Sequence, residues 1–337
     1  CYPDTAIPVM SYRHTHYEKN RSGVTANYQL SIGMHDIEAG LWYEQAERDE
    51  SRDWHKVINA SVNQHFDSTP YWTQYKNTFN TDTFKWYAQD SIALGDFTLN
   101  LGVKQYLVDL DKYDHYQGTT TAEINSDSDV LLSGGVLYQV TDFIELFTSY
   151  SENFAAIKDG VLERDSSDLS AIKPETAENI DLGIRYQTNA LKLTATAYSI
   201  TFDNRITFIA PGSDAGGIDY TIGTNGTYLN VGGIESSGLE LSASYMVTPA
   251  WSMYTSYTNN SSEYKGNAPG FTAGDAVIDS VEDLFVVSTD YYSGDFRFGL
   301  SAKYTGERGD VDSYTVLDFN TGYSAEVETG PFKSIDI

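Results

Sequence analysis

The stretch YLNVGGIESSGLELSASY, residues 228–245, changes its pattern halfway along. From Leu239 onward apolar and polar residues alternate, so that Leu239 and Leu241 fall on one parity and Glu240 and Ser242 on the other. This period of two predicts a β-strand with one apolar and one polar face. The preceding NVGGIESSG contains three glycines, which weaken an ordinary core strand and favour a bulged segment that passes from one solvent into another.

The composition favours β-structure and excludes nucleic acid as a partner. Aromatic residues make up 14% of the 337 residues and include 26 tyrosines, a residue type that favours strands and boundaries between apolar and wet surroundings. The formal net charge of -27 would repel phosphate groups. No segment approaches the roughly 20 apolar residues of a spanning helix, so a membrane location would depend on strands.

Six pairs of alternating segments are each joined by a link of two or three residues, as β-hairpins are. Between the hairpins lie polar segments that are far longer than usual connections. Short and long links alternate along the chain, so in a meander all the long ones fall at one end. The short links are MH (34–35), GD (95–96), TD (141–142), TNA (188–190), TPA (248–250) and SGD (293–295), and the long segments are 48–81, 112–128, 153–176, 204–226 and 259–282.

This asymmetry predicts a transmembrane β-barrel, with short turns on one side of the membrane and long loops on the other. In FRFGLSAKYTG, Phe296, Phe298 and Leu300 share a face opposite Arg297 and Lys303, as an apolar band facing lipid requires. Strands of about 10 residues are long enough to cross when tilted. We count about 13 strands, and since bacterial barrels close with even numbers, we expect an all-β, antiparallel up-and-down barrel that is incomplete, an open curved sheet of about 12–14 strands.

Asp90 does not fit the apolar face of its strand. It shares parity with Trp86, Ala88, Ile92 and Leu94 in FKWYAQDSIAL. Either a bulge shifts the register, or Asp90 lies near the membrane rim, where a charge costs little.

Two other interpretations remain open from the pattern alone. A secreted, soluble β-protein that binds glycans also has alternating strands, but strands of a soluble sandwich usually run about 5–6 residues. A passive porin or adhesin barrel shares the barrel pattern and would need rings of charged residues around an open pore.

Four segments resemble TonB-dependent outer-membrane receptors. WYAQDSIALGDFTLNLGVKQY (86–106) is similar to the hairpin of that family in which an aromatic-Ala-Gln-Asp strand leads through Gly-Asp to a strand bearing LNLG. LFTSYSENFAA (146–156), IKPETAENIDLGIRY (172–186) and YLNVGGIESSGLEL (228–241) are similar to three further family segments in the same order. The resemblance covers roughly residue 82 to the end.

The resemblance implies a multi-pass barrel of the cell outer membrane, in contact with lipid and lipopolysaccharide, that takes up a scarce nutrient. An iron-siderophore complex is the favoured ligand, with cobalamin, haem or an oligosaccharide as alternatives, and TonB would bind an N-terminal segment that this chain lacks. Such receptors have 22 strands and a plugged lumen, so residues 1–337 are expected to be a single barrel-domain fragment without a plug. NVGGIESSG would project above the outer leaflet, and LELSASY would descend through lipid.

We expect binding rather than catalysis, with no cofactor. The chain has no GxSxG, no HExxH and no phosphate-binding glycine loop. Neighbouring carboxylates are expected by chance among 48 acidic residues. His14 and His16 would share one side of a strand and could bind a metal, but with no carboxylate or cysteine set nearby in sequence we expect no metal site.

Candidate ligand contacts lie in the long polar segments, where aromatic rings mix with hydrogen-bonding side chains. The excess of acid over base argues mildly against a site built solely for highly anionic chelates. The candidate residues are Tyr71, Trp72, Tyr75, Phe154, Lys158, Arg164, Arg205, Phe208 and Tyr220.

Overall fold

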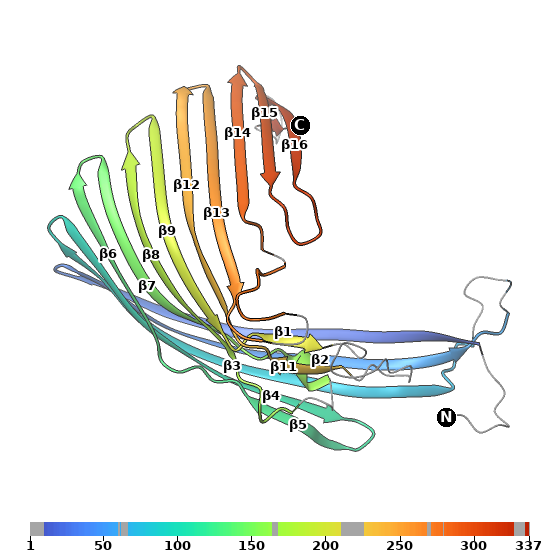
Figure 1. Cartoon of the computed structure of the whole chain (residues 1–337). Coiled ribbons are helices and arrows are strands. Elements are labelled where there is room, and N and C mark those ends of the chain that lie inside the picture. The colour runs from blue at the N-terminus through green and yellow to red at the C-terminus, as the bar shows by residue number, and fades with distance from the viewer. Residues whose placement is uncertain are drawn as a thin grey trace.

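A computed structural model of the chain describes residues 10–59, 61, 67–163, 168–209, 226–267, 271–278, 280–326 and 334–336. These residues form a curved antiparallel sheet of 15 strands that is open along one side (Figure 1). Strand β5 pairs only with β4 and lies off the main path, which leaves 14 strands along it. The predicted open sheet of 12–14 strands is therefore confirmed.

The strands follow one another in sequence order across the sheet, with β12 beside β9 because β10 and β11 pair separately. The elements are β1 (Ser11–Ile32), β2 (His35–Lys56), β3 (Trp72–Leu94), β4 (Phe97–Asp114), β5 (Thr119–Asn125), β6 (Leu131–Thr141), β7 (Ile144–Ala155), the 3-10 helix η1 (Asp159–Glu163), β8 (Glu175–Gln187), β9 (Leu191–Asp203), β10 (Ile206–Ile209), β11 (Thr227–Asn230), β12 (Ile234–Thr248), β13 (Trp251–Tyr264), β14 (Asp283–Ser293), β15 (Phe296–Thr305), β16 (Tyr314–Glu326) and β17 (Ser334–Asp336).

All six predicted hairpins are present, as β1–β2, β3–β4, β6–β7, β8–β9, β12–β13 and β14–β15. Their turns are two or three residues long and lie together at one end of the sheet (Figure 1). The long links, such as 156–174 and 204–233, lie at the other end. Among the described residues, no helix has the length and apolar content needed to cross a membrane.

The first long segment is mostly strand, which corrects the prediction of a loop over 48–81. Strands β1 and β2 each have 22 residues and β3 has 23, so β2 continues to Lys56 and β3 begins at Trp72. At about 3.3 Å per residue each reaches roughly 70 Å, well beyond the 9–11 tilted residues that cross a bilayer. The outer face of the projecting part carries polar side chains such as Asp49, Asp53 and Lys76, so the apolar alternation of that face stops while the backbone pairing continues.

Each strand has an inner and an outer face. We call inner the face against which η1 packs, through Leu162 and its contacts with Phe79, Val108 and Leu110. Apolar side chains on the outer face form rows across neighbouring strands. One such row runs through Ile184, Ala195, Leu241, Tyr257, Phe285 and Tyr304 on β8, β9, β12, β13, β14 and β15.

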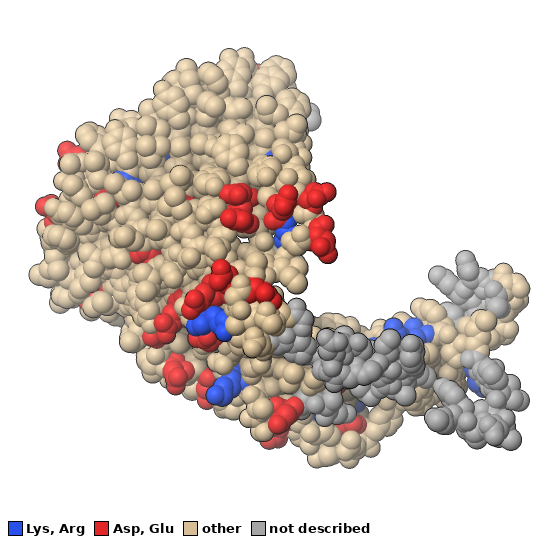
Figure 2. Space-filling model, in the orientation of Figure 1, with Lys and Arg blue, Asp and Glu red and all other residues tan. Residues whose placement is uncertain are grey.

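The outer-face rows are exposed and nearly uncharged. Leu182, Leu317 and Phe319, which belong to these rows, are 63%, 72% and 69% exposed, and contiguous exposed apolar side chains mark an interaction surface such as a membrane contact. Figure 2 shows few charged side chains over the short-turn half of β8–β15, while acidic residues gather where β14–β16 meet their long links.

The glycines in 228–245 mark a corner and a close contact. Strand β11 ends at Asn230, and Gly232 adopts a left-handed φ of 87° before β12 begins at Ile234. A Cβ on Gly238, inside β12, would lie 2.2 Å from the Asn259 carbonyl oxygen and 2.6 Å from the Tyr198 hydroxyl. The residue pattern of 228–245 therefore changes because its first half forms the corner between the β10–β11 sheet and the main sheet. Its second half belongs to β12, which carries apolar side chains on the outer face of the main sheet.

Asp90 lies on the outer face near the short turns, as the second of the two explanations proposed. The β3–β4 register runs without a shift from Leu94 to Asn77, so no bulge is present. His35, beside the first turn, contacts Asp90 with 2.7 Å between its Nδ1 and the Asp90 Oδ2. Asp90 lies four residues before β3 ends at the short turn, and the contact with His35 offsets part of the cost of a charge on this face.

Candidate ligand-binding face

The inner face of β1–β4 carries most of the positive charge of these strands. Because alternate residues share a face, the pairing register assigns every charged side chain to one side. Nine cations and five acids fall on the inner face, against one cation, Lys76, and eight acids on the outer face. The inner cation row comprises Arg13, Lys19, Arg21, Arg48, Arg52, Lys56, Lys85, Lys104 and Lys112, and the inner acids are Asp36, Glu38, Glu44, Glu50 and Asp114. The outer acids are Glu18, Glu47, Asp49, Asp53, Asp82, Asp90, Asp109 and Asp111.

The distal patch lies at the long-link end of this face, and we define it by Arg52, Trp54, Tyr71, Trp72 and Tyr75. The Trp54 and Trp72 rings stack with centroids 6.2 Å apart. The Arg52 guanidinium lies 4.9 Å from the Tyr75 ring centroid. Three candidate ligand contacts from the sequence therefore come together with a cation and a second indole, an arrangement that suits a flat anionic ligand.

Other cations of the row flank the same patch. Lys56 Nζ lies 5.8 Å from the Tyr71 ring centroid. The Arg52 Nε donates a hydrogen bond to Thr15 Oγ1 on β1 over 3.2 Å, which holds the guanidinium along the inner face of the sheet. The net charge of the whole chain conceals this positive face, because most of the acidic residues lie on other surfaces.

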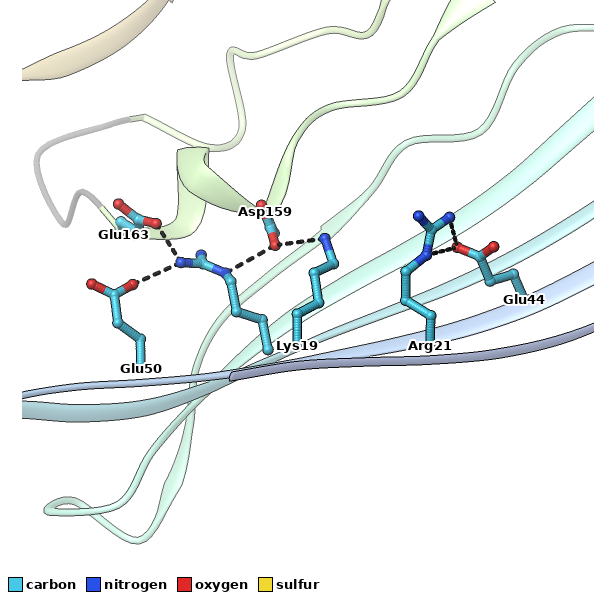
Figure 3. Close-up of polar contacts among 7 residues, drawn as sticks. Lys19, Arg21, Glu44, Glu50, Asp159 and Glu163 are labelled. Atoms are coloured by element: carbon cyan, nitrogen blue, oxygen red, sulfur yellow. Dashed lines mark hydrogen bonds and ion pairs between the residues drawn. The ribbon is translucent and has the colours of Figure 1, made fainter. Parts of the chain in front are cut away.

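Below the distal patch, Arg48 on β2 joins the inner face of the sheet to η1 through ion pairs with Asp159 and Glu163, both of which Figure 3 labels. Arg48 is 4% exposed and lies between three carboxylates. Its Nη1 lies 2.7 Å from Glu50 Oε2 and 2.6 Å from Glu163 Oε1, and its Nε lies 3.0 Å from Asp159 Oδ2. Lys19 Nζ reaches the same Asp159 oxygen at 3.8 Å.

Two physical effects set the protonation of this cluster. Burial on its own would lower the pKa of Arg48, but Asp159, Glu163 and Glu50 raise it, so the guanidinium stays charged. Tyr75 donates a hydrogen bond to Glu50 over 2.5 Å. Burial and that carboxylate raise the pKa of the Tyr75 phenol, so the donor keeps its proton far above neutral pH.

Apolar contacts hold the same link in place. Val161 and Leu162 of η1 are each 1% exposed. Leu162 packs with Phe79, and Val161 packs with Ile157 and Ile172 in a second small core. Burial of each of these two side chains stabilises the docked position of η1 by about 1.5–3 kcal/mol. The helix is therefore held firmly against the inner face of the sheet.

The remaining candidate residues are dispersed. Phe154 stacks on Tyr106, with centroids 5.5 Å apart, and packs against the core around Phe79. Lys158 is exposed and directly precedes η1. Phe208 on β10 faces Tyr228 on β11 with centroids 5.2 Å apart.

Arg205 lies beside another ring, and two candidates cannot be placed. The Arg205 guanidinium lies 5.9 Å from the ring centroid of Tyr264. Arg164 and Tyr220 lie outside the described residues.

Histidines gather on the outer face of the β1–β2 hairpin. As their spacing predicts, His14 and His16 share a side, with ring centroids 4.2 Å apart. His16 Nε2 lies 3.3 Å from Asp53 Oδ2 on the adjacent strand. Within the part of the chain that the structure describes, no group of three or more His, Cys, Asp or Glu residues has a geometry that could hold a metal ion.

The sequence reasoning missed Arg13, Arg48, Arg52, Trp54 and Lys85. They lie in segments predicted as loops or on strand faces that were assessed only for their apolar side. The signal that could have found them is parity, because Arg48, Arg52 and Trp54 share one side of a continuous strand.

Comparison with known proteins identifies the family. A family model described as the TonB-dependent receptor-like β-barrel matches residues 2–330. The chain belongs to this family. The resemblance drawn from the four sequence segments is thereby confirmed.

Relatives within the family are distant. The catecholate siderophore receptor Fiu of Escherichia coli (strain UTI89 / UPEC) is 24% identical over 345 residues, which cover 90% of this chain and 43% of Fiu. The pesticin receptor of Yersinia enterocolitica is 26% identical over 225 residues, 60% of this chain and 30% of that receptor. The chain thus spans less than half the length of these relatives.

Solved structures show the same fold. The ferric citrate transporter FecA in its unliganded form superposes with a TM-score of 0.69 at 22% identity, over 95% of this chain and 49% of FecA. The siderophore receptor PiuA from Acinetobacter baumannii gives 0.66 at 17% identity, over 92% of this chain and 50% of PiuA. About half of each solved barrel chain corresponds to the sheet described above.

Proposed function

We propose that this chain is the barrel part of a TonB-dependent receptor of the cell outer membrane that takes up an iron-siderophore complex of negative charge. The observation that carries the proposal is the inner cation row with its distal patch. Arg52, Trp54 and Trp72 give that patch a cation and two stacked rings, which together recognise flat anionic groups.

The ligand charge differs from what the composition indicated. A net charge of -27 argued mildly against a highly anionic ligand. The strand register instead supports an anionic ligand, because cations outnumber acids by nine to five on the inner face of β1–β4. A ligand in the lumen responds to the local field of that face rather than to the sum over the chain. A relative named a catecholate siderophore receptor agrees with an anionic ligand.

The location and the partners follow from the same proposal. The exposed outer-face rows support contact with lipid and lipopolysaccharide, and the family supports coupling to TonB. The protein would act by binding its ligand differently in two states rather than by bond chemistry, so we propose no enzymatic activity. Residues 1–337 would then form one barrel domain, with the plug elsewhere in the full-length protein.

The test is equilibrium binding of two iron chelates of different charge to the full-length receptor in detergent. An iron(III) tris-catecholate complex is anionic, and an iron(III) tris-hydroxamate complex is neutral. We expect Arg52→Glu to weaken binding of the anionic complex at least tenfold, because it reverses a charge beside the rings. Lys76→Glu reverses a charge on the outer face of β3 and should change binding less than twofold.

Trp72→Ala provides a second variant that leaves the charge unchanged. It should weaken binding of the anionic complex because it removes half of the stacked indole pair. If Arg52→Glu and Lys76→Glu bind the anionic complex equally well, or if the wild type prefers the neutral complex, the proposed ligand class is wrong.

A further inference from the structure

A groove with a volume of about 530 Å³ lies on the outer face, across β8, β9, β12, β13 and β14, which are neighbours in the sheet (Figure 1). Its floor consists of small side chains. Ala195 and Ala243 are diagonal neighbours on β9 and β12, and Thr255 on β13 lies directly opposite Ala243. Larger side chains border this floor, namely Ile184, Tyr186, Leu193, Leu241, Tyr257 and Phe285.

The lining of the groove is uncharged, and two of its hydroxyl groups are already hydrogen-bonded. The described residues that line it include no Asp, Glu, Lys or Arg. The Thr255 hydroxyl donates a hydrogen bond to the Val286 carbonyl oxygen over 3.0 Å, and the Tyr257 hydroxyl donates one to Asp283 Oδ1 over 2.6 Å. A ligand rich in polar groups would lose its water there without gaining charged partners, so the groove suits a hydrocarbon chain.

The groove begins beside the short turns and runs diagonally away from them. Tyr186, at its β8 end, lies one residue before β8 ends at Gln187. Phe285, at its β14 end, lies eight residues before β14 ends at Ser293. A ring with a polar tip, such as that of Tyr186, suits the level of the lipid headgroups. A chain whose headgroup lies at the short-turn rim could therefore enter at β8 and continue toward the middle of the apolar outer face.

The length of the groove matches one lipid chain. From β8 to β14 it crosses four strand-to-strand spacings of about 4.8 Å, or roughly 19 Å. Half of a hydrocarbon core of about 30 Å is about 15 Å, and a diagonal path is longer than a perpendicular one. The exposed outer-face rows continue on both sides of the groove, so the membrane contact that we propose for this face places lipid at its entrance.

We propose that this groove binds one acyl chain of a glycerophospholipid from the periplasmic leaflet, the leaflet on the side of the short turns. The chain is held on the floor formed by Ala195, Ala243 and Thr255 and does not exchange freely with the surrounding lipid. The proposal rests on the proposed function for the membrane location alone. It involves neither the inner face nor the iron chelate.

The experiment is native mass spectrometry of the full-length receptor in a mild detergent, titrated with phosphatidylethanolamine. The measured quantity is the Kd of each successively bound lipid. Ala243→Leu and Ala195→Leu each fill part of the floor with a branched side chain. Ala39→Leu is the matched control, because it adds the same atoms to an exposed alanine on the outer face of β2, outside the groove.

We expect the wild type to bind its first phospholipid at least tenfold more tightly than its second. Both floor variants should weaken the first binding event at least fivefold, and Ala39→Leu should change it less than twofold. Lipid A, the membrane anchor of lipopolysaccharide, should not displace the first phospholipid. The mobility of unheated samples on gels should be the same for all four proteins, which shows that the floor variants still fold.

Three results would overturn the proposal. If Ala243→Leu and Ala39→Leu bind the first phospholipid equally well, the lipid only coats the surface. If lipid A displaces the phospholipid at equal concentration, the chain comes from the opposite leaflet. If the wild type is a dimer that Ala243→Leu converts to a monomer, a second copy of the receptor covers the groove.

Failure of this inference can be distinguished from failure of the proposed function. Binding of the iron(III) tris-catecholate complex should be the same in the wild type and in Ala243→Leu, because the floor lies on the outer face. Loss of the lipid site with unchanged chelate binding would contradict the groove alone. A full-length protein that is soluble and monomeric without detergent would contradict the membrane location, and the groove proposal would fall with it.

Discussion

Arg48 and Asp159 lie 111 positions apart in the sequence, yet the Arg48 Nε donates a hydrogen bond to Asp159 Oδ2 over 3.0 Å. This contact joins the barrel wall to the link 156–174.

Arg48→Met should release the link from the wall. The change leaves Glu50, Asp159 and Glu163 close together without their shared cation, and breaking a buried ion pair from one side costs about 3–5 kcal/mol. Limited proteolysis within 156–174 should therefore become much faster. Arg21→Met is the matched control, because among the described residues Arg21 pairs with one carboxylate, Glu44, and its side chain is exposed, so its loss should cost less than about 1 kcal/mol. Equal protease sensitivity in the two variants would show that Arg48 does not hold the link.

Leu162→Ala tests the apolar half of the same attachment. Leu162 is 1% exposed against Phe79, Val108 and Leu110. Truncating it should weaken docking of the link by about 2–5 kcal/mol, through lost burial and the cavity left behind. Hydrogen exchange should increase over the link and stay unchanged in β12–β15. An increase in exchange over the whole sheet would instead mean that the link and the sheet unfold together as one cooperative unit.

Tyr75 gives the docked link a dependence on alkaline pH. Burial and the Glu50 carboxylate raise the pKa of the Tyr75 phenol above the ordinary value of about 10. The folded state therefore holds this proton more tightly than the unfolded state. The resulting stabilisation is fully present below pH 10 and is lost as the pH rises above 10 toward the folded-state pKa.

The measurement compares the unfolding free energy of the wild type and Tyr75→Phe between pH 9 and pH 11, roughly one unit to either side of the ordinary tyrosine pKa. The difference between the two should shrink as the pH rises, since only the wild type has the perturbed phenol. The titration of the other tyrosines contributes equally to both proteins and therefore cancels in this difference. A constant difference across this range would contradict the account of Tyr75.

Gly238→Ala should disrupt β12, whereas Gly134→Ala should be tolerated. A Cβ on Gly238 would lie 2.2 Å from a backbone oxygen of β13, so the strand must shift, at about 1–3 kcal/mol. A Cβ on Gly134 would meet its nearest atom at 3.8 Å, an ordinary contact. The fraction of refolded protein, read from the mobility of unheated samples on gels, should fall only for the first variant. Similar yields would mean that the sheet adapts easily at Gly238.

Much of the fold could be predicted from the sequence, because alternation and turn length are local properties. The turn between Leu94 and Phe97 and the apolar face of Leu239 and Leu241 both followed from a few neighbouring residues. The extended β1–β3 strands did not, since the outer face of their projecting parts is polar and the apolar alternation that marks a membrane-crossing strand ends there.

The candidate site was harder to predict because it depends on register between distant strands. Tyr71, Trp72 and Tyr75 were found from composition, but Arg52 and Trp54 join them only through the β2–β3 pairing. The positive charge of the inner face could not be predicted from the net charge, because the net charge adds a cation-rich inner face to an acid-rich outer face. Arg48 could not be matched with Asp159 without the path of the link across the wall.

If the inner face of β1–β4 captures an anionic iron chelate, as we propose, the iron itself should lie against that face. Crystals of the full-length receptor soaked with the iron(III) tris-catecholate complex would show the metal by its anomalous scattering. We expect an iron peak on the inner face beside Arg52 and Trp72, and we expect Arg52→Glu to remove it. A peak over another wall of the barrel, or one that persists unchanged in Arg52→Glu, would contradict it.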